Sequence, residues 1–307
     1  QIGEFSETGF TVIEGLLSLA EIDVLRSELD CFAHGHYQLS SVEAPGIGGR
    51  PNDDYEMKLK LERMTEGERL RAIQTVHFPH WVSTPCRELV ERKDLLAAIG
   101  ALAGVHLGTR VGEMTCIQSF VFYKHPGELG KAWHQDETYI QTDDGTLTGV
   151  WVALDDATVE NGCLWFVPGS HGSRQLFPME AHSRPDEFDH ALEAQGCDTN
   201  AEVPVEVAAG DAVVFNGYLL HSSGPNRSSS WRRAIANHYM NSESELRWNM
   251  PHDLLWPPAS AGVIWGPSLE SSLSVPPRAV DHFRTPRSSP SVRQNAPREP
   301  RTQRAGH

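Results

Sequence analysis

The sequence predicts a mainly β protein in which an antiparallel barrel or jelly roll is supported by helices from the N-terminal part of the chain. Helical apolar spacing is confined to residues from about 16 to 104. From about residue 115 to 241, short apolar runs with alternating polarity are separated by turn residues instead. Helices followed by many short strands favour this architecture over one in which helices and strands alternate along the chain.

Capping and turn residues delimit the N-terminal elements. Phe10–Ile13 has the composition of a strand, and Ser18 with Glu21 three residues later has the pattern of a capping box. A helix of about four turns is expected to follow, because apolar residues recur at helical spacing. Its apolar face consists of Ile22, Leu25, Leu29 and Phe32.

The segment between this helix and the strands is less regular. Residues 40–56 predict a loop, whereas Glu66–Val76 is expected to be helical. Thr84 followed by Pro85 has the pattern of an N-cap with proline at the first helical position. The helix that follows should end at Gly104. Its apolar face consists of Leu95, Leu96, Ile99 and Leu102.

The β region, from about residue 115 to 241, contains at least five apolar runs that we expect to be strands. Polar or glycine-containing turns separate them, as at residues 156–162 and at the Gly210-Asp211 pair. The expected strands contain Ile117, Phe120 and Phe122; Trp151, Ala153 and Leu154, starting near Thr146; Leu164–Val167; Val213–Phe215; and Arg232–Met240.

Composition restricts the domain organisation and the class of partner. We expect one domain over residues 1–283, followed by a disordered basic tail over 284–307, where six arginines and four prolines accompany few apolar residues. The net charge of -15 argues against a nucleic-acid partner, and no run approaches the roughly 20 apolar residues of a membrane helix. Five scattered cysteines without a CxxC pair predict free thiols and a cytoplasmic location.

Three residues have the identity and spacing of a metal site. His134 and Asp136 are two positions apart, so on one strand their side chains would point the same way. His221 would come from a strand that is distant in sequence and adjacent in space. Two histidines and one carboxylate with open positions form the ligand set of non-haem Fe(II) oxygenases. We expect other histidines to be surface or packed residues, with His171 a possible exception; they are His77, His80, His125, His171 and His238.

Arg232 lies eleven residues after His221 and would serve as the anchor of a dicarboxylate co-substrate. An arginine suits this role because its fork binds a carboxylate through two hydrogen bonds and is always charged. Alternation places Arg232 on one face of its strand, with Ala234, Ala236 and His238, and Arg233 on the other. Periodicity does not decide which face is directed into the barrel.

Several segments resemble the phytanoyl-CoA dioxygenase family, and within it the branch of phytanoyl-CoA dioxygenase domain-containing proteins. The resemblance covers roughly residues 4 to 241, and the run from Asn161 to His171 is its most specific part. The segments that resemble this family are Glu7–Gly15, His134–Asp136, Gly149–Thr158, Glu160–His171 and Gly210–Phe215.

The resemblance implies a double-stranded β-helix and an Fe(II)- and 2-oxoglutarate-dependent dioxygenase that uses O2 and releases succinate and CO2. It implies that His134, Asp136 and His221 bind iron and that Arg232, assisted by Ser223, binds 2-oxoglutarate. Three further residues are implied to line or support the co-substrate site, although Trp151 could instead be a core aromatic. They are Trp151, Gln135 and Gln118.

The substrate is left open by the sequence, beyond a small molecule or an acyl compound. Hydroxylation, desaturation, epoxidation and cyclisation all remain open, whereas Asp136 occupies the position that a halide would need. Basic residues between Arg50 and Arg71 could meet a CoA phosphate, but interleaved acidic residues favour a solvated face. The alternative functions are a non-catalytic metal or 2-oxoglutarate sensor or scaffold, and a zinc or manganese hydrolase, which leaves Arg232 unexplained.

Overall fold

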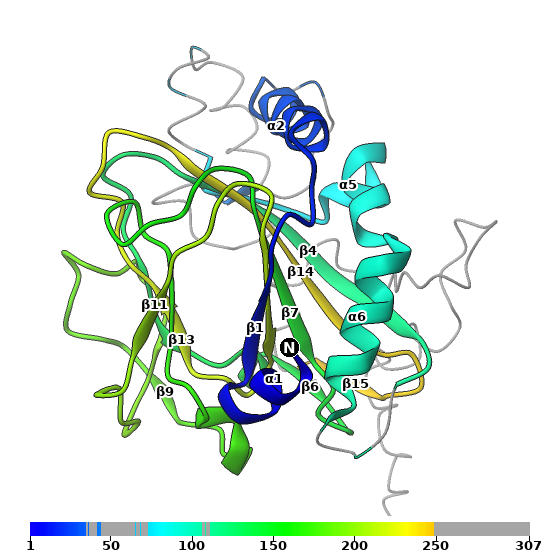
Figure 1. Cartoon of the computed structure of the whole chain (residues 1–307). Helices are drawn as coiled ribbons and strands as arrows, with labels where there is room; N and C mark the ends of the chain where they lie inside the picture. The colour runs from blue at the N-terminus through cyan, green and yellow to red at the C-terminus, as the bar shows by residue number, and fades with distance from the viewer. Residues whose placement is uncertain are drawn as a thin grey trace, which may run out of the picture.

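Two antiparallel sheets face each other and form the barrel of this computed structural model (Figure 1). The structure describes residues 1–34, 36, 42–43, 65, 68, 73–105, 108 and 111–248. The predicted basic tail and most of the predicted loop over 40–56 therefore lie outside the described residues. None of the described helices is long and apolar enough to cross a membrane.

The large sheet has the strand order β1-β12-β7-β14-β4-β3-β2, and the small sheet has the order β11-β8-β13-β5. The strands of the large sheet are β1 (Phe10–Ile13), β12 (Ala212–Asn216), β7 (Thr148–Ala153), β14 (Arg232–Asn241), β4 (Met114–Lys124), β3 (Thr75–His77) and β2 (Val42–Glu43). Those of the small sheet are β11 (Val203–Val205), β8 (Leu164–Phe166), β13 (His221–Ser223) and β5 (Lys131–His134). Two short pairs complete the strands, β6 (Ile140–Thr142) with β15 (Leu246–Trp248) and β9 (Met179–Glu180) with β10 (Glu193–Ala194).

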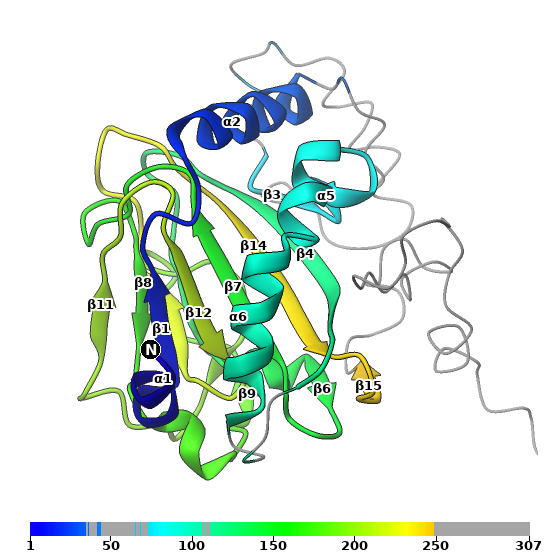
Figure 2. The ribbon, with the colours of Figure 1, turned by 45° about the vertical axis from the view of Figure 1, so that its right-hand side comes forward.

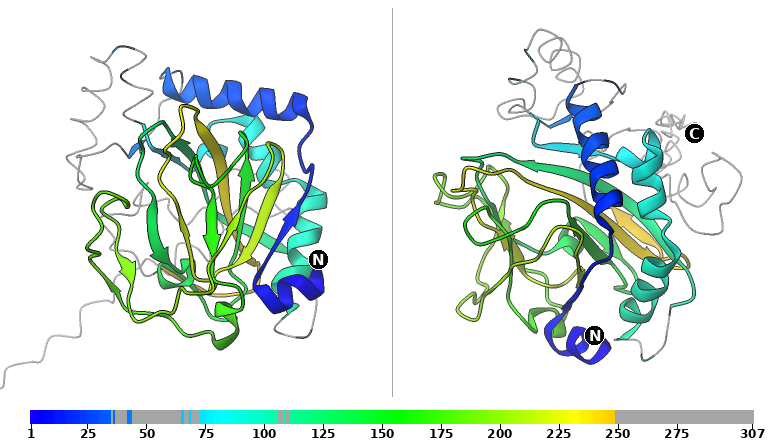
Figure 3. Two further views of the ribbon diagram at one scale, coloured as in Figure 1. Left: turned by 60° about the vertical axis from the view of Figure 1, so that its left-hand side comes forward. Right: turned by 45° about the horizontal axis from the view of Figure 1, so that its top comes forward.

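Helices cover the outer face of the large sheet. The helix α6 (Lys93–Ala103) lies along β4 and β14, and α2 (Leu19–Ala33) crosses one end of the barrel (Figures 2 and 3). The other described helices are α1 (Ile2–Thr8) and α5 (Thr84–Val90), with 3-10 turns η1 (Pro79–Trp81), η3 (Asp136–Thr138) and η4 (Ser170–Ser173). Apolar side chains of α2, α5 and α6 share one core with the outer face of the sheet, which includes Ile235 and Tyr239.

Strand alternation separates this outer core from the interior of the barrel. On β14, Ile235 and Tyr239 belong to the outer core, whereas Ala234 and Ala236 belong to a second core between the sheets. The second core also contains Trp151 of β7 and Phe166 of β8. The faces assigned by period two therefore determine which side chains can reach a site between the sheets.

Several sequence predictions are confirmed at the level of single residues. β1 spans Phe10–Ile13, and the capping box at α2 is formed by Ser18 and Glu21 through both of its hydrogen bonds. All five cysteines are free. The helical segment expected to end at Gly104 does so, with Gly104 as the C-cap of α6, but the structure divides it into α5 and α6 at Glu91 and Arg92. The predicted strands around Ile117, Trp151, Leu164, Val213 and Arg232 correspond to β4, β7, β8, β12 and β14.

Three further local predictions are wrong. Thr75 and Val76 are not helical but belong to β3, because they pair with Phe122 and Val121 of β4. The N-cap of α5 is Ser83, whose hydroxyl accepts a hydrogen bond from the backbone N–H of Cys86, so Thr84 is already helical. Within the predicted loop over 40–56, the described residues Val42 and Glu43 form β2.

Candidate metal centre

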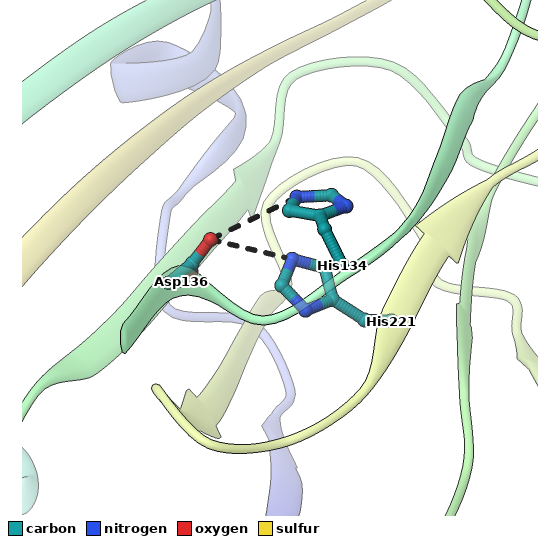
Figure 4. Close-up of side chains that lie close together, drawn as sticks. All are labelled: His134, Asp136 and His221. Carbon is teal, nitrogen blue, oxygen red and sulfur yellow. Dashed lines mark ion pairs between the residues drawn. The ribbon is translucent and has the colours of Figure 1, made fainter. Parts of the chain in front are cut away.

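His134, Asp136 and His221 converge at one end of the barrel interior (Figure 4). His134 is the last residue of β5, and His221, directly opposite it in the register, is the first residue of β13. Asp136 Oδ1 lies 3.8 Å from His134 Nε2 and 3.6 Å from His221 Nε2. One ligand atom from each of the three residues lies within 4.8 Å of the other two, a spacing that suits coordination of a single ion.

The sequence analysis expected Asp136 and His134 on one strand, but the structure places Asp136 outside the strand of His134. β5 ends at His134, and Asp136 is the first residue of η3. The intervening Gln135 keeps an extended backbone, with φ -128° and ψ 132°, so alternation still directs the flanking side chains to the same side. The expected convergence is therefore achieved although the secondary structure differs.

The hydrogen bonds of the two histidines prepare both rings for metal binding. His134 Nδ1 lies 2.7 Å from the Ala132 carbonyl oxygen, and His221 Nδ1 lies 2.9 Å from that of Leu219. A carbonyl can only accept, so each Nδ1 carries the proton and each Nε2 presents its lone pair toward Asp136. A backbone partner that fixes the tautomer in this way is typical of metal-binding histidines.

The electrostatics favour the protonation states that metal ligands require. Burial, reinforced by the nearby His221, lowers the pKa of His134 to about 3. Burial alone would raise the pKa of Asp136, but His221 and His238 hold it below its usual range. Near neutral pH the site thus presents a neutral His134 and an ionised carboxylate, which is the form that binds a divalent metal.

His238, which the sequence analysis placed among the surface or packed histidines, is buried and in addition contacts Asp136. It lies on β14, and its Nε2 is 2.9 Å from Asp136 Oδ2. The other carboxylate oxygen, Oδ1, is the one near His134 and His221. A hydrogen bond of this kind would orient the ligand carboxylate. The sequence signal that could have identified His238 is strand alternation, which puts it on the same face of β14 as Arg232.

The structure separates the two adjacent arginines. Arg233 points to the outer side of the sheet, where its Nε and Nη2 atoms donate to Asp155 at 2.9 and 3.0 Å. Arg232 points into the barrel and is only 3% exposed. Its guanidinium lies 5.2 Å from the ring centre of Trp151, and no acceptor lies within hydrogen-bond distance of its buried Nε among the described residues. A buried cation without an anionic partner is expected to bind one.

The remaining predicted site residues lie on elements around the barrel interior. Trp151 of β7 is opposite Ala236 of β14 and faces the interior, beside Arg232. Gln118 of β4 is buried and opposite His238 in the register. Ser223 of β13 is buried and accepts hydrogen bonds from Lys124 and from the backbone of Lys131.

Gln135 is directed away from the three converging residues. Its side-chain amide donates to the carbonyls of Gln175 and Tyr218, at 2.9 and 2.7 Å, and accepts from the backbone N–H of Phe177 at 3.1 Å. These contacts engage both ends of the amide with the backbone. They favour the supporting role over direct contact with a co-substrate.

The sequence has clear relatives among known proteins. Residues 5–234, well over half of the chain, match the phytanoyl-CoA dioxygenase (PhyH) family. The phytanoyl-CoA dioxygenase domain-containing protein 1 of Danio rerio is 31% identical over 283 residues, which cover 80% of this chain and 90% of that protein. The phytanoyl-CoA dioxygenase 1 of Oryza sativa subsp. japonica is 41% identical over 128 residues, or 41% of this chain and 45% of that protein.

Solved structures resemble this one in fold. The epimerase SnoN, in complex with Fe3+, alpha ketoglutarate and nogalamycin RO, superposes with a TM-score of 0.57 at 21% identity, covering 83% of this chain and 87% of that one. EctD from S. alaskensis, with 2-oxoglutarate and 5-hydroxyectoine, gives a TM-score of 0.56 at 19% identity, covering 80% and 77%. The double-stranded β-helix predicted from the sequence is thereby confirmed.

The family match extends over both sheets of the barrel and includes His134, Asp136, His221 and Arg232 within its span. The relatives are named as a dioxygenase and as a dioxygenase domain-containing protein. Of the two solved structures of the same fold, one holds Fe3+ and alpha ketoglutarate and the other 2-oxoglutarate. The chain belongs to the phytanoyl-CoA dioxygenase family and is an oxidoreductase of the non-haem iron- and 2-oxoglutarate-dependent class.

Proposed function

We propose that this chain binds Fe(II) through His134, Asp136 and His221 and 2-oxoglutarate through Arg232, and that it hydroxylates a small-molecule or acyl substrate. The observation that carries the proposal is the pairing of these two features inside one barrel. A convergent set of two imidazoles and one carboxylate lies at one end of the interior face of β14. At the other end lies Arg232, which is buried and has no carboxylate partner among the described residues.

The three ligand side chains suit Fe(II) because they combine imidazole nitrogens with a hard carboxylate oxygen and leave coordination positions open. When bound, the iron supplies the oxidative chemistry, in which one atom of O2 converts 2-oxoglutarate to succinate and CO2 and the other oxidises the substrate. The protein's part is to hold and orient the reactants. Asp136 stays ionised in this role, and His238 fixes the direction of its carboxylate.

The residues between the two ends of β14 fit an extended dicarboxylate. Ala234 and Ala236 are the interior residues between Arg232 and His238, and they are opposite Phe122 and Phe120 of β4. Small side chains flanked by aromatic rings provide an apolar lining for the carbon chain of a ligand. Arg232 then binds the far carboxylate through its fork, and Trp151 limits the position of the guanidinium.

The acyl class of substrate is supported by the names of the relatives, which include phytanoyl-CoA dioxygenases. A cytoplasmic location stays a prediction. The solvated face that we expect for the basic residues between Arg50 and Arg71 also stays a prediction, because that segment lies almost entirely outside the described residues. The alternative of a sensor that binds metal or 2-oxoglutarate without catalysis has no support in the site, because the three proposed ligand residues and Arg232 are all present.

Succinate production tests the proposed function. The purified protein, given Fe(II), 2-oxoglutarate and air, should form succinate in a slow reaction that accelerates with one member of a panel of acyl-CoAs and free acids. Succinate should disappear when O2 or iron is withheld. Tight binding of 2-oxoglutarate with no succinate under any of these conditions would favour the non-catalytic sensor or scaffold instead.

A further inference from the structure

A second buried cation lies beside Arg232. Lys124 is the last residue of β4 and is directly opposite Arg232 in the register of β4 with β14. It is 7% exposed and therefore nearly as buried as Arg232. The same alternation that turns Arg232 into the barrel thus turns Lys124 toward the interior as well.

Lys124 connects the two sheets at this end of the barrel. Its Nζ atom donates to the Ser223 hydroxyl at 3.1 Å and to the Gly224 carbonyl at 2.6 Å, both at the end of β13 in the small sheet. Its stem packs against Gly162, where an added Cβ would meet Lys124 Cδ at 3.0 Å and would clash with the Gly224 carbonyl oxygen. The ammonium group is therefore held in a defined place by its surroundings.

Neither cation is neutralised by an ion pair. Among the described residues, no carboxylate lies within ion-pair distance of Lys124 or of Arg232, whereas the outward-facing Arg233 has Asp155. The charged groups around Lys124 are Arg232 on β14, Lys131 on β5, and Glu128 and Asp189 from neighbouring loops. Burial, with the repulsion from Arg232, lowers the pKa of Lys124 well below its usual value. Two adjacent buried basic groups are costly to keep charged, so an anion that binds beside them would favour the charged form of Lys124.

The contacts of Ser223 show how that anion would be met. The Ser223 oxygen accepts one hydrogen bond from Lys124 Nζ and a second from the backbone N–H of Lys131 at 3.2 Å. A hydroxyl has two acceptor positions and one proton, so with both lone pairs engaged Ser223 can act only as a donor. The Ser223 hydroxyl, oriented as a donor by Lys124 and lying near two basic groups, is therefore suited to bind a carboxylate oxygen.

We propose that Lys124 is a second positive group of the co-substrate site, which attracts the far carboxylate together with Arg232 and holds the Ser223 hydroxyl as a donor to it. This inference rests on the proposed function and names a positioning residue within it. It implies that the site prefers a dicarboxylate over a 2-oxo acid that has no second carboxylate.

The test measures binding of 2-oxoglutarate and of pyruvate to the iron-loaded protein without O2, by calorimetry. Pyruvate carries the same 2-oxo acid group but has no far carboxylate. Lys124→Met should weaken 2-oxoglutarate binding at least about tenfold and leave pyruvate binding within about twofold. Lys131→Met is the matched control, because it removes a nearby charge while its backbone N–H still reaches Ser223, and it should change neither affinity by more than about twofold.

Thermal unfolding without 2-oxoglutarate separates this role from that of a structural link between the sheets. If Lys124 serves the anion, Lys124→Met should unfold at the same temperature as the wild type or higher, because a buried basic group without an anionic partner among the described residues is removed. Lys124→Gln, which keeps a donor for Ser223 but no charge, should also weaken 2-oxoglutarate binding and serves if the methionine variant does not fold.

Two results would overturn the inference. One is unchanged affinity for 2-oxoglutarate in a folded Lys124 variant, and the other is equal weakening of 2-oxoglutarate and pyruvate. Either would leave the proposed function intact, provided that the wild type prefers 2-oxoglutarate and Arg232→Ala abolishes this preference. A wild type that binds both acids equally well would contradict the proposed function itself.

Discussion

The two faces of β14 carry the same types of residue and use them in opposite ways. On the outer face, Arg233 is paired with Asp155, which also contacts Arg26 of α2, and Tyr239 donates to the Val90 carbonyl. On the inner face, Arg232 has no carboxylate partner among the described residues, and His238 contacts the carboxylate of Asp136, a proposed metal ligand. The arginine of the outer face is thus paired within the fold, whereas we propose that the arginine of the inner face pairs with a bound co-substrate.

The difference also concerns the size of side chains. Outside, Ile235 and Tyr239 fill the core under the helices. Inside, Ala234 and Ala236 separate Arg232 from His238. Large residues thus face the permanent packing partner, and small ones face the place where we propose that 2-oxoglutarate binds. Substitutions on the two faces should therefore have different effects, on stability outside and on binding inside.

The largest expected effect is at the metal ligands. Asp136→Ala removes the only carboxylate of the three-residue set, so the purified protein should lose its Fe(II), where the wild type binds one iron per chain. Metal analysis after dialysis measures this directly. A variant that keeps full iron occupancy would show that Asp136 is not a ligand.

His238 should have a smaller effect on the same property. His238→Ala removes the hydrogen bond to Asp136 Oδ2 but no proposed ligand. Loss of such an outer partner typically weakens metal binding about 10–100-fold. Fe(II) or Co(II) titration would measure this change, and Gln118→Ala on the neighbouring strand provides a comparison at a buried interior residue. An unchanged affinity in His238→Ala would reduce that histidine to a packing role.

On the outer face the expected effect is on stability. Arg233→Ala breaks two side-chain hydrogen bonds to Asp155 in a mostly buried ion pair. A hydrogen bond to a charged group typically contributes about 1.5–3 kcal/mol to stability. We expect the free energy of unfolding to fall by about 2 kcal/mol, measured by urea denaturation. A variant of wild-type stability that loses 2-oxoglutarate binding would mean that the assignment of the two faces is reversed.

The pH dependence of this pair is the smallest effect. Burial alone would raise the pKa of Asp155, but hydrogen bonds and charge from Arg233 lower it below its usual value. Its contribution to stability is thus present above the unfolded pKa of about 3.9 and lost as the pH falls through the lower folded value. The stability difference between wild type and Asp155→Asn should therefore shrink below about pH 4. A difference that stays constant down to pH 2 would contradict this linkage.

The comparison of faces also explains how much the sequence could predict. Local signals identified the capping box at Ser18, the strand Phe10–Ile13 and the helix that ends at Gly104, because these depend on neighbouring residues. Residue type and spacing identified the three residues that converge at the candidate metal centre. The family resemblance added the double-stranded β-helix, which the solved structures of the same fold confirm.

What the sequence could not predict depends on contacts between distant segments. Thr75 and Val76 are strand residues because β4 is beside them, and no local pattern contains that information. Period two divided β14 into two faces but did not indicate which one is inside. The contacts of His238 with Asp136 and of Lys124 with Ser223 join residues about a hundred positions apart, so they became visible only in the folded chain.

The affinity of Arg232→Ala and Arg233→Ala for 2-oxoglutarate, measured side by side on iron-loaded protein without O2, tests the central claim most directly. Removing one partner of a buried, hydrogen-bonded charge pair costs about 3–5 kcal/mol, so Arg232→Ala should bind 2-oxoglutarate roughly two to three orders of magnitude more weakly. Arg232→Lys should restore little, because an ammonium group lacks the fork. Arg233→Ala should bind like the wild type, and both variants should keep their iron. Equal affinities in the two alanine variants would contradict the claim that the inner face of β14 binds the co-substrate.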